Sequence, residues 1–339
     1  MSIENPRFNS QLILSAQVVI ACPEFSESLA FYTEQLGFRV DMIFPADAPS
    51  TAVVTGYGLQ LRLESNAVAN APTIFLTCDA VMFASSAIKQ YRAPEGTKIV
   101  LIAAIASITM PDVVSEFSVS MHQDNDAWST GRAGMQYRDL IPSRLGGRFI
   151  ASHIRIPDGG EVPDYVHYHN VRFQMIFCKS GWARVVYEDQ GAAFLLHAGD
   201  LVLQPPGIRH RVLEASKGLE VIEMGSPAIH ETFADHSITL PTQHLKVDRC
   251  FGCQRFVRHI AETAIWQPWI ASGFQARDSG IAAATHGLAE VRVIKTNTNS
   301  QQNSTQNTVL KHDGELLFLC VLDGEMRLSS EVYGTHLLC

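Results

Sequence analysis

Four polar side chains in the middle of the chain have the types and the spacing of ligands to a transition metal. His167 and His169 are separated by one residue, Gln174 follows shortly after them, and His210 comes later, behind a proline–glycine turn. In an extended strand, side chains two residues apart face the same way, so His167 and His169 point to one side. Three imidazoles and an amide oxygen predict a site for one divalent transition metal (Fe, Ni, Zn, Mn, Co or Cu) rather than for Ca or Mg, which prefer more oxygen ligands.

The segments around these residues predict the strands that would position them. Short apolar runs alternate with turn signals rich in glycine and proline. This even spacing is typical of an all-β barrel or jelly roll. The expected strands are Phe149–Ile156, Phe173–Cys178, Ala183–Tyr187 and Leu201–Leu203.

Two segments resemble the sequence motifs of the cupin superfamily. Residues 159–181, GGEVPDYVHYHNVRFQMIFCKSG, are similar to cupin motif one, G-x5-H-x-H-x3–4-E-x6-G. Residues 199–210, GDLVLQPPGIRH, are similar to motif two, G-x5-P-x-G-x2-H-x3-N. The resemblance implies an RmlC-like jelly-roll barrel in which His167, His169 and His210 hold a metal.

The chain departs from the family pattern at three places. There is one extra residue between Gly160 and His167, Glu214 stands where the family often has asparagine, and Gln174 occupies the place of the usual glutamate. The neutral amide of Gln174 leaves the site one negative charge short. A bound divalent ion would then keep more of its charge, acidify bound water more strongly, and attract an anionic or enolate-forming substrate.

Softer candidates for substrate binding surround the predicted ligands, and none of them is an obvious general base. Two arginines flank His210, and either one can hold a carboxylate through two hydrogen bonds, although exposed arginines are commoner. A histidine lies on a strand with Arg148 and Arg155, and a tyrosine, like Trp182, would line the cavity or simply form core. These candidates are Arg209, Arg211, His153 and Tyr187.

The first block, residues 1–126, predicts a small α+β domain. An apolar strand at Val18–Ala21 precedes a helix with apolar residues at helical spacing from Phe25 to Leu36, and further strands follow. The segment SLAFYTEQLGFRV at residues 28–40 resembles one βαβββ module of the vicinal-oxygen-chelate (glyoxalase-like) superfamily. PEGTKIVLI at residues 94–102 is similar to the closing strand of a second, shortened module.

The glyoxalase-like resemblance implies four places for metal ligands, one on each of four strands. Gln17, Arg62, Thr73 and Val100 fall on these places. Because an arginine and a valine cannot replace carboxylate or imidazole ligands, we expect this domain to lack a metal. Structural, dimerising or lid roles remain open for it.

The central barrel is expected at residues 127–245, and residues 246–339 resemble a diverged and incomplete copy of it. MQYRDL at Met135 recurs as FQARDS at Phe274, and two further segments recur in the same order. With Gly324 aligned on Gly181, His312 matches His169, but Leu310 matches His167 and Leu317 matches Gln174. Such a half-barrel would be structural, as in two-domain cupins (bicupins). The polar run at residues 296–307 predicts an exposed loop.

Composition excludes several classes of function. The net charge of −8 and the pI near 5.9 argue against nucleic acid as the partner, because phosphate binding needs a basic surface. No secretory signal is visible, and the most apolar run, Ile99–Met110, is too short to span a bilayer. Seven cysteines, an odd number at irregular spacing, favour reduced thiols and a cytoplasmic location. For the single C-x-x-C pair, Cys250 and Cys253, a zinc or redox role is disfavoured.

The sequence thus predicts a mainly β, overall α+β chain that works as a metal-dependent enzyme on a small polar metabolite with a keto, enol or carboxylate group. A redox-active ion such as Fe(II) would indicate dioxygenation, and Zn, Ni or Mn would indicate isomerase or lyase chemistry. The alternative is a protein without catalytic activity that uses the metal to bind or sense a small molecule. A third hypothesis is a purely structural oligomeric protein. A homodimer is compatible with all three.

Overall fold

The structure of the chain is a computed structural model. In it the chain forms two compact units. The first unit comprises Met1–Ser107 and the second Ile108–Cys339, so the division precedes the boundary expected at residue 126. The second unit contains the predicted barrel together with residues 246–339. The residues described are 17–44, 49–67, 71–78, 90–103, 108–121, 128–297, 309 and 311–338.

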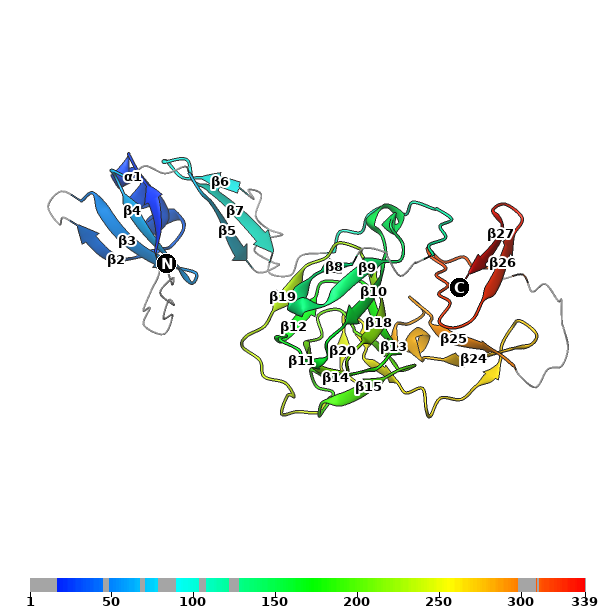
Figure 1. The fold of residues 1–339 in the computed structure, drawn as a ribbon. Helices are drawn as coiled ribbons and strands as arrows, with labels where there is room; N and C mark the ends of the chain where they lie inside the picture. Colours follow the sequence, from blue (N-terminus) through cyan, green and yellow to red (C-terminus); the bar gives the residue numbers. More distant parts are fainter. Residues whose placement is uncertain are drawn as a thin grey trace, which may run out of the picture. The chain divides into compact units, whose positions relative to one another are not determined.

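The first unit holds two small sheets beside one short helix (Figure 1). The four-stranded sheet has the order β1-β4-β3-β2, with β1 parallel to β4 and the other neighbours antiparallel. The three-stranded sheet has the order β5-β7-β6, with β5 parallel to β7. The strands are β1 (Val18–Ala21), β2 (Arg39–Phe44), β3 (Thr51–Gly56), β4 (Leu59–Glu64), β5 (Thr73–Cys78), β6 (Gln90–Arg92) and β7 (Lys98–Ala103).

The helix of the first unit forms where the apolar residues have helical spacing. It runs as α1 (Phe25–Ala30) and continues as a π-helical turn, η2 (Phe31–Gln35). Gly37 follows in the left-handed region with φ +72°, a conformation that glycine adopts without a steric penalty. Phe25 and Tyr32 are buried in one cluster with residues of both sheets, so the two sheets share a core.

The second unit is built around two sheets that enclose a common core, as a jelly-roll barrel requires. The larger sheet has seven strands in the order β22-β16-β13-β18-β10-β9-β8. The smaller has six, in the order β15-β14-β17-β12-β19, with β11 paired to β17. Their strands are β8 (Ser129–Thr130), β9 (Gln136–Asp139), β10 (Ile150–Ile156), β11 (Gly160–Glu161), β12 (His167–His169), β13 (Phe173–Ser180), β14 (Trp182–Tyr187), β15 (Phe194–His197), β16 (Leu201–Leu203), β17 (His210–Ala215), β18 (Leu219–Ser226), β19 (Thr232–Ala234) and β22 (Val257–His259).

Alternate residues of the larger sheet serve two different cores. Ile154, Cys178 and Val221 face inward and join residues of the smaller sheet in the barrel interior. Ile222 and Met224 face outward and pack under the C-terminal segment, which covers this side of the sheet. The period of two along β18 therefore separates an inner face from an outer face, and this distinction decides which polar residues reach the barrel interior.

Two glycines of the predicted motifs occupy backbone conformations that favour glycine. Gly181 turns the chain from β13 into β14 with φ +76°, and a Cβ atom there would lie 2.3 Å from Ser216 Oγ. Gly207 has φ +75° in the turn that leads into β17. These turns fix the strands that carry Gln174 and His210.

The C-terminal residues form small separate sheets instead of closing a second barrel within the described residues. The described residues of the second unit also form two short 3₁₀ turns, η3 (Arg132–Gly134) and η4 (Arg144–Gly147), and one short α-helix, α3 (Ile281–Ala284). The C-terminal strands are β20 (Cys250–Phe251), β21 (Gln254–Arg255), β23 (Gln267–Pro268), β24 (Phe274–Asp278), β25 (Arg292–Thr296), β26 (Met326–Ser330) and β27 (Gly334–Leu338). Most of the predicted polar loop, as well as Leu310, lies outside the described residues.

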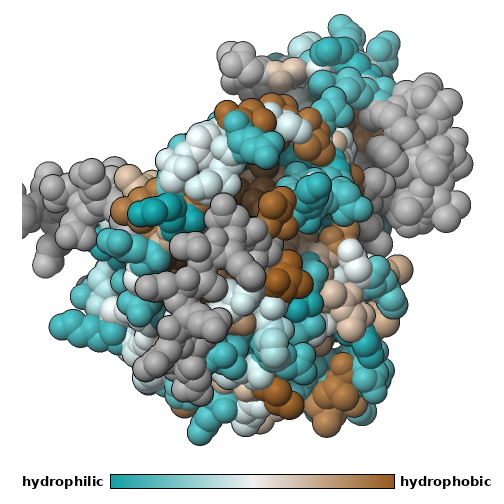
Figure 2. Space-filling model, turned by 90° about the vertical axis from the view of Figure 1, so that its right-hand side faces the viewer, coloured by the Kyte–Doolittle hydropathy of each residue, from teal (hydrophilic) through white to brown (hydrophobic). Residues whose placement is uncertain are grey.

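The described residues contain only short helices and several free cysteines. Within the described residues, no helix combines the length and the apolar character needed to cross a bilayer. On the described part of the face in Figure 2, hydrophobic residues form small separate areas among hydrophilic ones. Cys22 and Cys178 are buried free thiols, whereas Cys250 and Cys253 are free and exposed.

Candidate metal site

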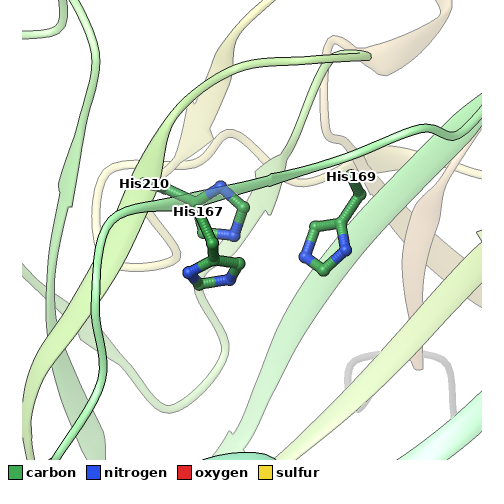
Figure 3. A group of neighbouring side chains, drawn as sticks. All are labelled: His167, His169 and His210. Carbon is green, nitrogen blue, oxygen red and sulfur yellow. The ribbon is translucent and has the colours of Figure 1, made fainter. Parts of the chain in front are cut away.

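Three histidines converge inside the barrel of the second unit. His167 and His169 stand at the two ends of β12, and His210 begins β17, where it is the register partner of His167. One nitrogen from each ring lies within 4.8 Å of the others, and Figure 3 shows His169 facing the neighbouring rings of His167 and His210. His167 is 1% exposed and His210 is 4% exposed, so the cluster is an interior feature.

Hydrogen bonds to the Nδ1 atoms orient the imidazoles. His167 Nδ1 lies 2.9 Å from the carbonyl oxygen of Tyr165, and His210 Nδ1 lies 3.0 Å from that of Ile208. Because a carbonyl oxygen only accepts, both Nδ1 atoms must carry the hydrogen, and Nε2 keeps the lone pair. Each ring is therefore prepared to coordinate through Nε2.

Two side chains add further support behind the rings. His169 Nδ1 lies 2.8 Å from the hydroxyl oxygen of Thr232 on the neighbouring strand β19. The Asp164 carboxylate lies 3.6 Å from His167 Nδ1 and accepts hydrogen bonds from the backbone N–H groups of Tyr165 and Val212. Such contacts fix the ring and raise the basicity of the coordinating nitrogen.

Gln174 faces the barrel interior from the neighbouring sheet. Its register partner is Gly225 on β18, and a Cβ atom on Gly225 would lie 4.0 Å from the ring of His230. The His230 ring centroid is in turn 5.4 Å from that of His169. Gln174 thus lies on the inward face of the larger sheet, beside the position of Gly225.

The amide of Gln174 is buried and only half satisfied. The residue is 2% exposed, and its Nε2 donates to Glu223 Oε1. Its Oε1 atom is buried and has no hydrogen-bond partner among the residues that the structure describes. An unsatisfied buried acceptor costs about 1–3 kcal/mol, and coordination of a cation would remove this cost.

The residues present fit a divalent transition metal. Nitrogen ligands lie about 2.0–2.1 Å from such an ion, so two of them on one ion are at most about 4.2 Å apart. The ligand atoms of His167, His169 and His210 all lie within 4.8 Å of one another, which is close to this spacing. Three imidazoles, together with an amide oxygen on the inward face of the larger sheet, are a donor set for a first-row ion.

Of the softer candidates, the structure brings Tyr187 to the cluster. Its ring stacks against His210 with centroids 5.5 Å apart and lies tilted against the ring of Phe256 at 4.6 Å. Its hydroxyl accepts a hydrogen bond from Gln204 Nε2 at 2.8 Å, and burial raises the pKa of the phenol. Tyr187 therefore stays protonated and supports His210 from behind.

The structure does not bring the other three to the cluster. Arg209 is paired with the Asp235 carboxylate at 3.0 Å and lies over the ring of Tyr168. Arg211 follows His210 on β17, and neighbouring side chains of a strand point to opposite faces.

His153 also lies on the wrong face of its strand to line the site. It is the register partner of the outward-facing Ile222, and its ring nitrogens contact Arg138 and Glu220. Burial lowers the pKa of this imidazole. The sequence alone does not show on which face of the sheet His153 lies, because that depends on strand register.

Sequence reasoning missed the residues that surround the ligands. They are Asp164, Glu223, His230 and Thr232; the last three lie outside the two motifs, and Asp164 stands at an unspecified position of the first. For Asp164 the signal was its place three residues before His167. For Glu223 no local signal existed, because the same strand also carries Glu220 on its other face and only the strand register separates the two.

The match to a known family covers the strands that build this site. The model of the cupin domain matches residues 152–224, which include His167, His169, Gln174 and His210. Residues 152–224 form a cupin domain. The mainly β architecture of the second unit agrees with this assignment. A comparison with functionally curated proteins finds no match.

Several solved structures are similar to part of the chain. One is an RmlC-like cupin from Shewanella frigidimarina, with 23% identity and a TM-score of 0.28, covering 34% of this chain and 96% of that one. Another is KdgF from Halomonas sp., with 19% identity and a TM-score of 0.27, covering 32% and 94%. A third is the polyketide cyclase RemF from Streptomyces resistomycificus, with 18% identity and a TM-score of 0.30, covering 37% and 89%.

Proposed function

We propose that the cupin domain holds one divalent transition metal through His167, His169 and His210, with Gln174 as the fourth ligand. The site then acts on a small polar metabolite that carries a keto, enol or carboxylate group. The reaction is dioxygenation, or isomerase or lyase chemistry, according to which ion occupies the site. The observation that carries the proposal is the convergence of three imidazoles, two of which, His167 and His210, have Nδ1 contacts that leave Nε2 as the coordinating atom.

The residues of the chain have separate tasks in this proposal. When bound, the ion supplies Lewis acidity to a carbonyl or carboxylate oxygen of the substrate. Tyr187 and Phe256 exclude water behind His210, and Thr232 holds the ring of His169. Since Gln174 carries no charge, the site keeps more of the positive charge of the ion and favours an anionic substrate.

The first unit is proposed to have a structural role. In the first unit, the parallel pair β1–β4 and the parallel pair β5–β7 support a glyoxalase-like module and a shortened second one. At two of its expected ligand places, Gln17 donates to Gln60 and Arg62 pairs with Glu64. These side-chain contacts support a role without a metal there.

The segment after residue 245 is proposed as a degenerate second cupin. The antiparallel pair β24–β25 has the order, and the short intervening helix, of the pair β9–β10 in the first cupin domain. Residues 316–322, which match the strand of Gln174, are not a strand in the structure. Leu316 and Phe318 instead pack on the outer face of the cupin sheet.

Elemental analysis of the purified chain beside a His167→Ala/His169→Ala variant tests the proposal. We expect about one transition-metal ion per wild-type chain, because one histidine alone cannot retain it, and loss of this ion from the variant. Equal metal contents in the two proteins would contradict the proposal. With the metal retained, product formation from keto or carboxylate compounds supports an enzyme, whereas stoichiometric binding without product supports the sensing alternative.

A further inference from the structure

Glu223 is a half-buried acidic neighbour of the proposed fourth ligand. It lies on β18, and its Oε1 accepts the hydrogen bond from Gln174 Nε2. Gln174 is the register partner of Gly225, so Glu223 reaches it diagonally from two residues away on the same inward face. The carboxylate absent from position 174 is therefore present one strand away.

We propose that Glu223 is a positioning residue that fixes the amide of Gln174 with its oxygen turned toward the three imidazoles. This inference rests on the proposed metal site. It explains how a glutamine at position 174 can act as a metal ligand. It differs from the usual cupin arrangement, in which the glutamate itself contacts the metal.

The chemistry of the pair gives the amide one preferred orientation. A free glutamine side chain can present either its oxygen or its NH₂ group, and only the oxygen can bind a cation. An ionised carboxylate only accepts, so Glu223 selects the NH₂ group of Gln174. The oxygen must then point away from Glu223, which agrees with its being buried without a hydrogen-bond partner.

The arrangement also keeps a negative charge beside the site without placing it on the metal. The carboxylate of Glu223 interacts with the ion through the amide of Gln174, because charge-assisted hydrogen bonds polarise the group they bind. A more electron-rich amide oxygen is a better ligand. Contacts of this kind, one layer behind the ligands, change metal affinity by about 10- to 100-fold.

An exchange of the two side-chain types tests the proposal. The variants are Glu223→Ala, Glu223→Gln, Gln174→Glu and the double exchange Gln174→Glu/Glu223→Gln. Glu223→Ala removes the acceptor, and Glu223→Gln allows the amide pair to reverse its direction. Gln174→Glu places two carboxylates at hydrogen-bond distance, where they repel each other. The double exchange restores one carboxylate, one amide and a single direction of donation.

We expect each single variant to lower the affinity for Co(II) or Zn(II) by about 10-fold or more, and the double exchange to recover most of the loss. The readouts are chelator competition and the visible absorption spectrum of the Co(II)-loaded protein, neither of which needs an assay of activity. Urea denaturation identifies any variant that has lost its fold. The isosteric Glu223→Gln variant keeps the test informative if Glu223→Ala does not fold.

The matched control is Glu220→Gln, on the same strand but with its carboxylate bound to Lys179 and His153 on the outer face. Its metal affinity should equal that of the wild type. Wild-type affinity in Glu223→Ala, or a double exchange no better than the weaker single variant, would overturn the role of Glu223 and leave the metal site standing. A wild-type chain that binds no ion would overturn both.

Discussion

The cupin domain and the C-terminal segment proposed as its copy differ in what they enclose. The first surrounds a cluster of polar residues, and the second packs on the outer face of the cupin sheet. In the cupin domain, β12, β13 and β17 bring three histidines and Gln174 into an enclosed core. In the C-terminal segment, Leu317 stands at the place of Gln174 and is 48% exposed, while its neighbours pack on the cupin sheet. Similar sequence patterns therefore yield different tasks, because only one of them closes two sheets around its polar residues.

The largest difference between the two regions should appear in metal content. His210→Ala removes one of the three converging imidazoles, and we expect bound metal to fall from about one ion per chain to near zero. His312→Ala changes an exposed histidine of the C-terminal segment and should leave the content unchanged. Both are measured by elemental analysis after dialysis. Metal loss in His312→Ala would contradict the assignment of the metal site to the cupin domain alone.

The C-terminal segment should contribute strongly to stability even though it lacks a site. Ile281 in α3 is fully buried against the outer face of the cupin sheet. Ile281→Ala should lower the free energy of unfolding by about 2–5 kcal/mol, measured by urea denaturation. Leu317→Ala, at an exposed position, should change it by less than about 0.5 kcal/mol. Equal small effects would show that the segment does not fold with the cupin domain.

Contacts behind the ligands should tune the site in the cupin domain. Thr232→Val keeps the shape of the side chain but removes the hydroxyl next to His169 Nδ1. We expect metal affinity to fall about 10-fold, measured by chelator competition, with an unchanged far-UV circular dichroism spectrum. Thr335→Val, in the hairpin β26–β27, is the matched change in the C-terminal segment and should not alter the affinity.

The smallest effect should come from the ion pair that joins the two regions. Arg148 and then Arg172 hold the pKa of the Glu315 carboxyl at about 2, below its usual 4.5. A carboxyl with a lowered pKa in the folded state stabilises fully above the unfolded value. This stabilisation is lost as the pH falls from about 4.5 toward 2.

Glu315→Gln removes this pH-dependent contribution and tests it directly. At neutral pH the variant should be less stable by under about 1 kcal/mol, because the pair is partly exposed and screened by solvent. Its stability should also fall less steeply than that of the wild type below pH 4.5. Parallel stability curves for the two proteins would contradict the assignment. Thermal unfolding across this pH range is the measurement.

Sequence spacing was enough to find the three histidines, because two of them share a strand and the third follows a turn with fixed glycine and proline positions. The helix from Phe25 and the strands of the cupin domain also formed where apolar periodicity placed them. These features depend on neighbours within a few residues, which a sequence displays directly.

Features set by strand register could not be predicted in this way. His153 was a candidate for the site, yet its partner in the ladder, Ile222, places it on the outer face. Glu223 was overlooked because its contact with Gln174 joins strands that are far apart in the sequence. The organisation of the C-terminal residues depends on the surface they cover, which no local pattern encodes.

The hydrogen bonds that orient His167 and His210 end on backbone carbonyls two residues earlier in the chain, at Tyr165 and Ile208. A carbonyl is present whichever side chain occupies those positions. Tyr165 is 41% exposed, so the side chain at this position can be exchanged without removing the carbonyl that holds His167, whereas Ile208 also belongs to the barrel core. The backbone can therefore hold the rings of His167 and His210 in place while exposed side chains around them change.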